Sequence, residues 1–301
     1  MITASIPAGS YSGAQIVSLT SDKGALIFYT LDGSTPTTAN GTRYKSPIAI
    51  SDNKTLKFFG VDSFGNVSAI QSVTYTIAPF STTANLLAHW LASDLSASGD
   101  GASISTWNDK STNSNNLTSA SSGENPTFKI AKNGKAAVFF TGGSQKLSTG
   151  NVIMPQYMTV YIRVLFDQLP VSNQTIISQD LLGSGPRLWH ETVDSTSFKA
   201  VGFNGTSGLV DQQSGTLVQS QWHTFVARHT PTTIEAFFDN VSNGALSIIS
   251  QNAGTQKINM GGTYNGSGVW AESLNGYIAE IRIYSAYHDN GQISTVISSL
   301  A

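Results

Sequence analysis

The chain contains no cysteine, and this absence removes two classes of protein from consideration. A disulfide scaffold and a thiolate metal site both need cysteine side chains. Charged residues are also scarce, at 11% of the 301 residues, and the formal net charge is −2. The sequence has no basic stripe, whereas nucleic-acid binding draws most of its affinity from neutralised phosphates. We therefore expect no nucleic-acid partner.

Long apolar segments and an export signal are missing as well. No apolar run approaches the roughly 18 residues of a membrane span, so we expect no membrane insertion. The first four residues lead directly into domain-like sequence, without the regions of a signal peptide. We expect either a protein that reaches its site without Sec export or a fragment of a longer chain. The missing cysteines fit cytosolic, virion and many bacterial surface proteins alike.

What the chain does have is a globular share of hydrophobic residues and many uncharged polar ones. Hydrophobic residues make up 40% of the sequence, which is enough to fill a core. Serine, threonine, asparagine and glycine supply most of the polarity. Hydroxyl and amide groups suit hydrogen bonding to neutral sugars, but they equally suit the exposed faces of antiparallel strands.

Residues 1–79 show the short alternating runs of an all-β domain. Strands are predicted at 15–20, with Val17 and Leu19 on one face, and at 26–30, which is expected to be mostly buried. Further strands are predicted at 55–62 and 73–77. Asp32 and Asp62 lie in turns, where an aspartate is satisfied by nearby backbone more often than by calcium. So many strands in under 80 residues predict a sandwich.

These residues also resemble a known family. The segments PAGSY (7–11), VSLT (17–20), FYTLDGSTP (28–36), YKSPI (44–48) and VDSFGNVS (61–68) are similar to the Ig-like C-terminal module of chitobiases and β-hexosaminidases. The resemblance covers nearly the whole of residues 1–79. It implies an accessory module that acts as a spacer or an ancillary binder.

A short polar linker is predicted at 80–84, followed by a second domain at 85–301. Strands are predicted at 158–166 and 277–284, and the runs 222–228 and 233–239 indicate a hairpin. One helical pattern closes the chain, with Ile293, Val296, Ile297 and Leu300 at helical spacing.

The second domain resembles another known fold. WLASDL (90–95), WNDKS (107–111) with NNL (115–117), WHTF (222–225), FFDN (237–240) and LNGYIAEIRIY (274–284) are similar to a concanavalin A-like (laminin G-like) jelly roll of phage tail and bacterial surface proteins. The predicted fold class is therefore all-β, a small Ig-like β-sandwich plus a concanavalin A-like jelly roll with a short C-terminal helix. This fold hosts binders, enzymes and spacers, so the resemblance leaves function open.

Catalytic and metal sites find little support in the sequence. A glycosidase needs two cooperating carboxylates, and the nearest pair, Glu191 and Asp194, falls on opposite faces of a regular strand. Hydrogen bonding to a neighbouring strand or loop explains Glu280. We expect no enzyme, no catalytic residue and no cofactor, and no zinc because the histidines lack ligand spacing. Calcium stays open, with Asp180 and Asp211 in loop-like segments as weak candidates.

Tryptophans offer the sharper hypothesis. Trp90, Trp107 and Trp222 fall where the family pattern has tryptophan, so core packing explains them. Trp189 and Trp270 are not required by that pattern and lie beside Gly/Ser-rich segments. Either each covers the end of a sheet, or both belong to a sugar-binding surface. The predicted ligand-binding residues are Arg187, Trp189, His190, Tyr264, Asn265 and Trp270.

Three functions remain in order of preference. The first is a non-catalytic carbohydrate-binding or adhesion module of a larger surface or phage virion protein, such as a tail or receptor-binding protein. Its partners would be a cell-surface glycan or polysaccharide and other virion or surface-protein subunits, and its place would be extracellular or on the virion surface. The second is a structural spacer or virion decoration protein without sugar binding. The third is a polysaccharide-degrading enzyme.

Overall fold

The computed structural model describes residues 2–12, 15–78, 80–179, 189–192, 197–203, 208–214, 216–242, 244–248, 254–264 and 270–301. The chain divides into two compact units. Unit 1 comprises Met1–Ser81 and Asn290–Gln292, and unit 2 comprises Thr82–Asp289 and Ile293–Ala301. The division between residues 81 and 82 falls within the predicted linker.

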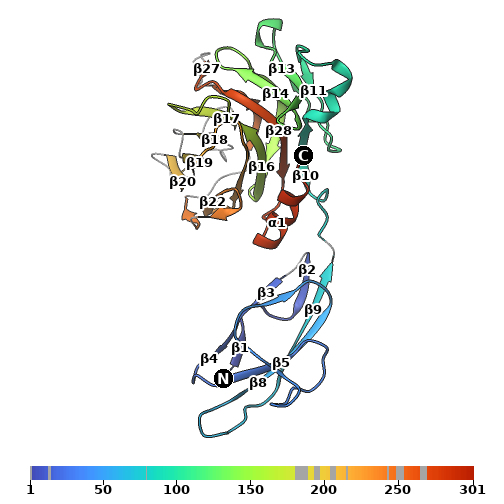
Figure 1. Ribbon diagram of the computed structural model, residues 1–301, viewed down its shortest axis with the longest axis vertical. Coiled ribbons are helices and arrows are strands. Elements are labelled where there is room, and N and C mark those ends of the chain that lie inside the picture. The colour runs from blue at the N-terminus through green and yellow to red at the C-terminus, as the bar shows by residue number, and fades with distance from the viewer. Residues whose placement is uncertain are drawn as a thin grey trace. The chain divides into compact units, whose positions relative to one another are not determined.

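Unit 1 is the predicted small β-sandwich (Figure 1). Its core joins Val17, Ile50, Leu56, Phe58 and Tyr75, so one face of each strand is buried. Among the described residues, its largest sheet has the order β2 (Gly9–Ser12), β9 (Gln71–Ala78), β8 (Lys54–Val61), β5 (Leu26–Thr30) and β6 (Thr42–Arg43). Two smaller sheets pair β1 (Ile2–Ala4) with β4 (Leu19–Ser21) and β3 (Gln15–Val17) with β7 (Ile48–Ile50).

The strands and turns of unit 1 mostly follow the sequence predictions. The expected strand at 15–20 is two strands, and Val17 and Leu19, predicted to share one face, both lie in the core of unit 1. Strand β5 has the predicted bounds, but only Ile27 is buried, so the expectation of a mostly buried strand is wrong. The reason is its place beside the two-residue edge strand β6, which covers little of it.

Both turn aspartates are bonded as predicted. The Asp32 carboxylate accepts hydrogen bonds from the backbone N–H and the hydroxyl of Ser34, at 3.0 and 2.6 Å. The Asp62 carboxylate accepts from the backbone N–H groups of Phe64 and Asn66, at 2.9 and 2.8 Å. These bonds hold the pKa of each carboxyl below its usual range, with the Ser34 and Asn66 side chains as the main causes.

Unit 2 is a sandwich of two large antiparallel sheets, which confirms the predicted jelly-roll class. Within the described residues, the nine-stranded sheet runs β13 (Thr127–Lys132), β14 (Lys135–Thr141), β28 (Asn275–Tyr284), β16 (Met158–Leu165), β21 (Trp222–His229), β22 (Thr233–Phe238) and β23 (Val241–Ser242), with β10 (Leu86–Leu91) on β28 and β24 (Leu246–Ser247) on β22. The eight-stranded sheet runs β11 (Thr106–Trp107), β12 (Leu117–Thr118), β15 (Leu147–Met154), β25 (Gly254–Met260), β17 (Gln174–Gln179), β18 (Trp189–Thr192), β19 (Ser197–Phe203) and β20 (Gly208–Ser214).

One hydrophobic core fills the space between these two sheets. Phe198 of the eight-stranded sheet stacks on Phe225 of the nine-stranded sheet, with ring centroids 4.0 Å apart. Trp90 and Trp107 are fully buried in this core, as predicted. Helix α1 (Asn290–Ser298) closes the chain, and the short 3₁₀ helices are η1 (Ala92–Ser98) and η2 (Ser122–Glu124).

The motif at 107–117 caps the edge strand β10. The Asp109 carboxylate accepts hydrogen bonds from the backbone N–H groups of His89 and Asn115, both at 2.8 Å. The Asn113 amide donates to the carbonyls of Leu86 and Leu87, at 2.7 and 3.0 Å. Backbone groups that an edge strand would leave unpaired are thereby satisfied.

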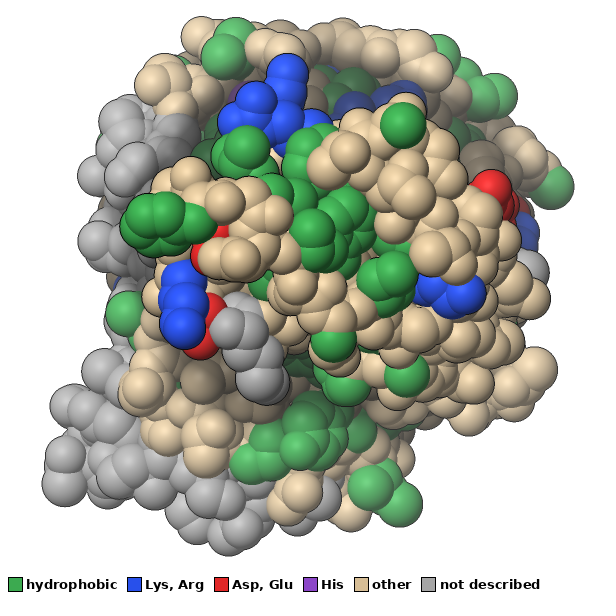
Figure 2. Space-filling model, turned by 90° about the horizontal axis from the view of Figure 1, so that it is seen from below, with side chains coloured by type: hydrophobic (Ala, Val, Ile, Leu, Met, Phe, Trp, Pro, Cys, Tyr) green, Lys and Arg blue, Asp and Glu red, His purple; other side chains and the backbone are tan. Residues whose placement is uncertain are grey.

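The surface reflects the low charge of the sequence. On the face in Figure 2, uncharged side chains and backbone cover most of the area, and charged side chains are scattered. Within the described part of the chain, every helix is too short or too polar to cross a membrane.

Candidate functional site

Most of the predicted sugar-binding residues lie where side chains are not described. Arg187 and Asn265, and the calcium candidate Asp180, lie outside the described residues. Trp189 lies in β18, Tyr264 in β26 (Thr263–Tyr264) and Trp270 in β27 (Trp270–Ala271), but their side chains lie outside the described part. For these three residues the structure gives the backbone alone.

The backbones of these aromatic positions converge on strand β17 (Figure 1). Trp189 pairs with Ser178 of β17, and Tyr264 pairs with Trp270 in the β26–β27 hairpin. The Ser178 hydroxyl donates to the carbonyl of Gly262 at 3.0 Å, directly before that hairpin. Near the start of β17, the Thr175 N–H donates to the carbonyl of Glu272 at 2.7 Å, directly after that hairpin. Strand β17 therefore lies between the two segments that carry Trp189 and Trp270.

Two predicted placements need correction. His190 is fully buried among core residues, with its ring centroid 6.0 Å from that of Phe198, so it does not lie on an exposed binding surface. The reason is strand alternation, which turns residue 190 toward the core and residue 191 to the opposite face of the sheet. Asp211 lies in strand β20, paired with Ala200, and not in a loop. Its polar neighbours in the sequence conceal a strand that is defined by its pairing with β19.

A cluster of polar side chains occupies the face of the eight-stranded sheet that is turned away from the core. It is centred on Thr175, whose hydroxyl lies 3.2 Å from a carboxylate oxygen of Glu191 and 3.2 Å from one of Glu272. The Asn173 amide donates to the other oxygen of Glu272 at 3.3 Å. Thr175 and Glu191 are fully buried. We call Asn173, Thr175, Glu191, Lys199 and Glu272 the β17 cluster.

Lys199 supplies the positive charge of the β17 cluster. It lies directly across from Glu191 in the β18–β19 ladder, and the two side chains form an ion pair. Burial lowers the pKa of Lys199, and the nearby charge of Glu272 opposes that shift. The side chain of Lys199 keeps 15% of its surface exposed. Lys199 and the half-buried Glu272 are therefore the charged groups of the cluster that stay partly exposed, while the buried Glu191 and Thr175 hold them in position.

Glu272 holds an unusual backbone conformation. Its φ is +55°, in the left-handed region that residues other than glycine seldom adopt. Bonds from Thr175 and Asn173 to its carbonyl and carboxylate hold it there. Residues held in this way cost about 1–3 kcal/mol and cluster at functional sites.

The sequence interpretation missed Glu272 and Thr175 and compared Glu191 only with Asp194. A signal was present, since Glu191 and Glu272 each lie two positions after a tryptophan that the fold pattern does not require. Alternation places Trp189 and Glu191 on one face of β18, whereas Glu272 lies directly after β27. The contact between the two segments depends on a long-range pairing that local patterns do not show.

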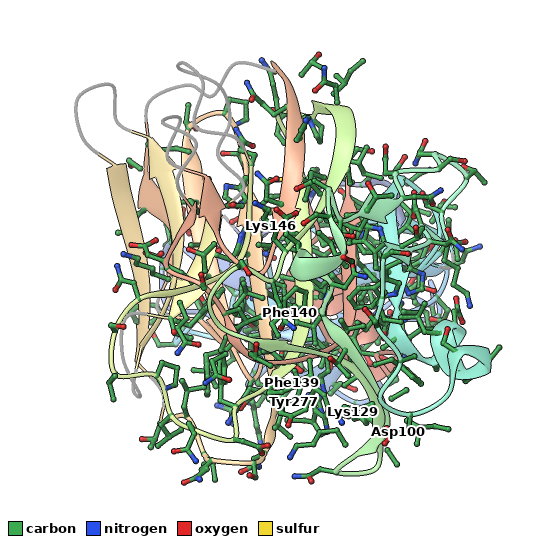
Figure 3. The ribbon with its side chains drawn as sticks, turned by 90° about the horizontal axis from the view of Figure 1, so that it is seen from above. Asp100, Lys129, Phe139, Phe140, Lys146 and Tyr277 are labelled. Atoms are coloured by element: carbon green, nitrogen blue, oxygen red, sulfur yellow. The ribbon has the colours of Figure 1, made fainter. Side chains whose placement is uncertain are left out.

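A second aromatic surface lies on the outer face of the nine-stranded sheet (Figure 3). Phe139 stacks on Tyr277 with ring centroids 4.3 Å apart, whereas its neighbour Phe140 is buried in the core. Trp222 packs against this pair outside the main core, so its predicted core position is wrong. A hollow of about 230 Å³ beside Tyr277 is lined by Asp100, Lys129 and Lys132 among others.

The Tyr277 surface is held by its own contacts. The Tyr277 hydroxyl donates to Asp167 at 2.9 Å, and the Lys132 ammonium lies 4.6 Å from the ring centroid. The Trp222 indole N–H donates to the Lys132 carbonyl at 3.2 Å. We interpret this surface as packing over the sheet, since its polar groups are directed at one another.

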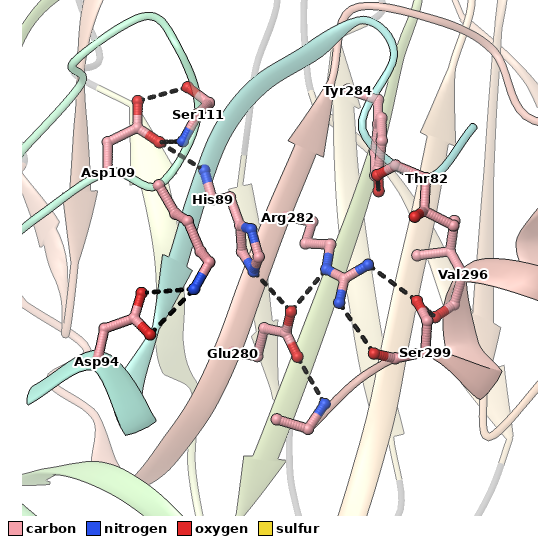
Figure 4. Close-up of polar contacts among 12 residues, drawn as sticks. Thr82, His89, Asp94, Asp109, Ser111, Glu280, Arg282, Tyr284, Val296 and Ser299 are labelled. Carbon is pink, nitrogen blue, oxygen red and sulfur yellow. Dashed lines mark hydrogen bonds and ion pairs between the residues drawn. The ribbon is translucent and has the colours of Figure 1, made fainter. Parts of the chain in front are cut away.

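Glu280 is a structural residue, as the sequence predicted. Its carboxylate binds His89 of β10 at 2.7 Å, Arg282 at 2.6 Å and the backbone N–H of Ala301 at 2.6 Å (Figure 4). It thus joins strands β10 and β28 to the end of the chain. Among the described residues, no three histidine, aspartate or glutamate side chains are grouped closely enough to hold a metal ion.

Comparison with known proteins supports the two fold assignments. Residues 6–72 match the chitobiase/beta-hexosaminidase C-terminal domain family, as the sequence resemblance predicted for unit 1. No curated protein matches the chain. Among solved structures, the binding domain of botulinum neurotoxin DC in complex with SialylT is 11% identical, with a TM-score of 0.51, over 73% of this chain and 53% of its own. Trypanosoma rangeli sialidase is 12% identical, with a TM-score of 0.51, over 84% of this chain and 46% of its own.

These likenesses concern the fold alone. The chain spans about half the length of both proteins.

Proposed function

We propose that this chain is a non-catalytic glycan-binding module of a larger protein that works outside the cell. The β17 cluster is the observation that carries the proposal. Its carboxylates and its ammonium group are held in place by neighbouring side chains before any ligand binds. This reduces the loss of conformational entropy on binding. Carboxylate and ammonium groups bind sugar hydroxyls as acceptors and donors, respectively.

The segments that carry Trp189 and Trp270 support a ligand site on the face that holds the β17 cluster. Strand alternation assigns positions 189 and 191 to one side of β18, and the β26–β27 hairpin ends at Ala271, directly before Glu272. Sugar rings present C–H faces that pack on aromatic rings, while a few polar groups fix their orientation. Trp189 and Trp270 would supply the packing, and the β17 cluster would supply the orientation.

One observation favours a second function, glycoside hydrolysis. Glu191 and Glu272 both lie 3.2 Å from the Thr175 hydroxyl, so their nearest oxygens are at most about 6.4 Å apart, twice that distance. Retaining glycosidases separate their carboxyl groups by about 5–5.5 Å, and one of the two must be protonated. The ion pair with Lys199 suits a Glu191 that stays charged, so we propose binding without cleavage.

The enzyme alternative is tested with soluble polysaccharides and detection of new reducing ends. We expect none above the level of a boiled sample. Reducing ends that accumulate with the intact chain, and fall when Glu191→Gln or Glu272→Gln is used, would make the chain a hydrolase.

The parent protein is part of the proposal. A phage tail or bacterial surface protein fits the sequence resemblance of unit 2, and unit 1 would then act as a spacer or ancillary binder. A spacer or decoration role for the whole chain, without sugar binding, is the competing proposal. Sialylated glycans belong in the test because two similar folds were solved with SialylT or sialic acid bound.

Trp270→Ala separates binding from packing. Loss of a stacked aromatic should weaken binding of the best glycan-array ligand several-fold, about 1 kcal/mol, while the melting temperature stays nearly unchanged. Tyr157→Ala is the matched control, since Tyr157 is a half-exposed aromatic residue of unit 2 between β15 and β16. Lost stability with unchanged binding would make Trp270 a packing residue.

A further inference from the structure

A cavity of about 330 Å³ lies in unit 2 between strand β10, the 110–112 loop and the residues after α1. This volume is at the lower end of the range of about 300–1,000 Å³ for small-molecule sites. Two cationic side chains, Lys110 and Arg282, and the imidazole of His89 line it, and each comes from a different segment. Hydroxyl-bearing residues also line it, including Thr82, Ser111 and Ser299.

The carboxylates that hold these cations are not part of the wall. Glu280 binds His89 and Arg282, and Asp94 binds Lys110 at 3.0 Å (Figure 4). Neither is among the described residues that line the cavity, and no other carboxylate is. The charged groups of the wall are therefore positive, while the balancing negative charge lies to the side.

Donors remain for a ligand after all these contacts. Arg282 is nine-tenths buried and has five N–H groups. Three of them are bonded to Glu280 and Ser299, and the Tyr284 hydroxyl is close enough to take a fourth. Lys110 uses two of its three N–H groups on Asp94. Arg282 and Lys110 thus each have at least one donor available for a ligand.

We propose that this cavity binds a small oxyanion, a carboxylate, sulfate or phosphate group on a sugar-sized ligand. Charge-assisted hydrogen bonds from Arg and Lys to such oxygens are about twice as strong as neutral ones. Burial of Arg282 and its bonds to Glu280 and Ser299 fix the guanidinium, so little reorganisation opposes binding. The site is separate from the β17 cluster and does not depend on the proposed glycan-binding function.

The test is an NMR titration of the intact chain with sodium sulfate, inorganic phosphate, glucuronate and glucose, at low and matched ionic strength. We expect saturable shifts of the backbone amides of Lys110, Ser111 and Thr112 with the three oxyanions and none with glucose. Phosphate and sulfate should compete with glucuronate. Binding by glucuronate alone would restrict the site to carboxylates. Shifts that do not saturate, or that spread over the surface, would overturn the proposal.

Lys110→Gln keeps the fold and removes one donor, because this side chain is half-exposed. We expect oxyanion affinity to fall about five- to tenfold, as for the loss of one charge-assisted bond. Lys54→Gln in unit 1 is the matched control, since it also removes a partly exposed lysine from an ion pair, with Asp52 at 3.2 Å. Unchanged affinity in Lys110→Gln, or an equal loss in Lys54→Gln, would overturn the proposal. Glycan binding at the β17 cluster should survive Lys110→Gln, so the two proposals fail separately.

Discussion

At the scale of single residues, unit 2 contains two kinds of buried ionisable group. Glu280 is surrounded by partners for its charge. His190 and His229 are fully buried with ring centroids 5.8 Å apart, and none of their four ring nitrogens has a hydrogen-bond partner among the described residues. Glu280 stabilises the fold in its charged form, whereas His190 and His229 are compatible with the fold only in their neutral form.

Glu280→Gln should lower the free energy of unfolding of unit 2 by about 3 kcal/mol. The change leaves the buried Arg282 guanidinium without its counter-charge. All five tryptophans lie in unit 2, so urea unfolding followed by tryptophan fluorescence reports this unit. Asp94→Asn is the control, because its ion pair with Lys110 is half-exposed and worth at most about 1 kcal/mol. Equal losses in both variants would contradict the assignment.

Acid should also act through Glu280. Burial alone would raise the pKa of this carboxyl, but the His89 hydrogen bond, the Ala301 N–H and the Arg282 charge together hold it below its ordinary value. A carboxyl with a lowered pKa stabilises the fold above its unfolded value, about 4.3, and loses that contribution as pH falls further. Below pH 4.3 the wild type should therefore lose stability more steeply than Glu280→Gln.

His229→Leu should flatten the stability of unit 2 between about pH 6.5 and pH 4. Burial lowers the pKa of His229 to about 4, and that of His190 also lies well below its ordinary value. Between these pH values the unfolded chain binds protons that the folded chain does not bind. The free energy of unfolding therefore falls as the pH is lowered. The difference between the pKa of His229 in the unfolded chain and its value of about 4 in the folded chain corresponds to about 3 kcal/mol of the free energy of unfolding. Urea midpoints at pH 7.5 and 4.5 measure it, and identical shifts in variant and wild type would count against a buried, neutral His229.

At the scale of elements, the β17 cluster depends on the connection between β25 and β26. Gly261 has a φ of +96°, its N–H donates to the Ile176 carbonyl of β17, and its carbonyl accepts from Leu274. A Cβ there would meet Phe140 at 2.6 Å and the Gln145 carbonyl at 2.8 Å. Only glycine tolerates both the φ and the approach.

Gly261→Ala should destabilise unit 2 by about 2 kcal/mol or more and weaken glycan binding, because it displaces the hairpin that leads to Glu272. The measurements are the fluorescence midpoint and the affinity for the best array ligand. Gly150→Ala is the control, since a Cβ at Gly150 meets open space. Unchanged stability and unchanged glycan binding in Gly261→Ala would show that this connection does not position the β17 cluster.

The elements themselves were largely predictable from the sequence, and the site was not. Strands β5, β16, β21, β22 and β28 match the predicted runs closely, because alternating residues and turn residues are local signals. The β17 cluster joins Thr175, Glu191 and Glu272, which are far apart in sequence and meet only through strand pairing. Asp211 shows the same limit, since only its pairing with β19 reveals a strand in that polar segment.

At the scale of the whole molecule, the two units have separate cores and should fold separately. Limited proteolysis should cut first within 79–84, and residues 82–301 expressed alone should keep the fluorescence midpoint of the intact chain. The hydrogen bond from the Tyr284 hydroxyl to the Thr82 carbonyl, 2.6 Å, is retained in that fragment. A fragment that fails to fold would place the boundary elsewhere.

Glycan binding by the β17 cluster is the central claim, and a glycan array with the intact chain and Glu272→Gln tests it most directly. The array should include neutral and sialylated glycans, with the melting temperature of both proteins measured alongside. We predict saturable binding of at least one glycan by the wild type, and signals reduced about tenfold in Glu272→Gln at nearly equal melting temperature. Absence of binding to every glycan, or equal binding by both proteins, would contradict the claim.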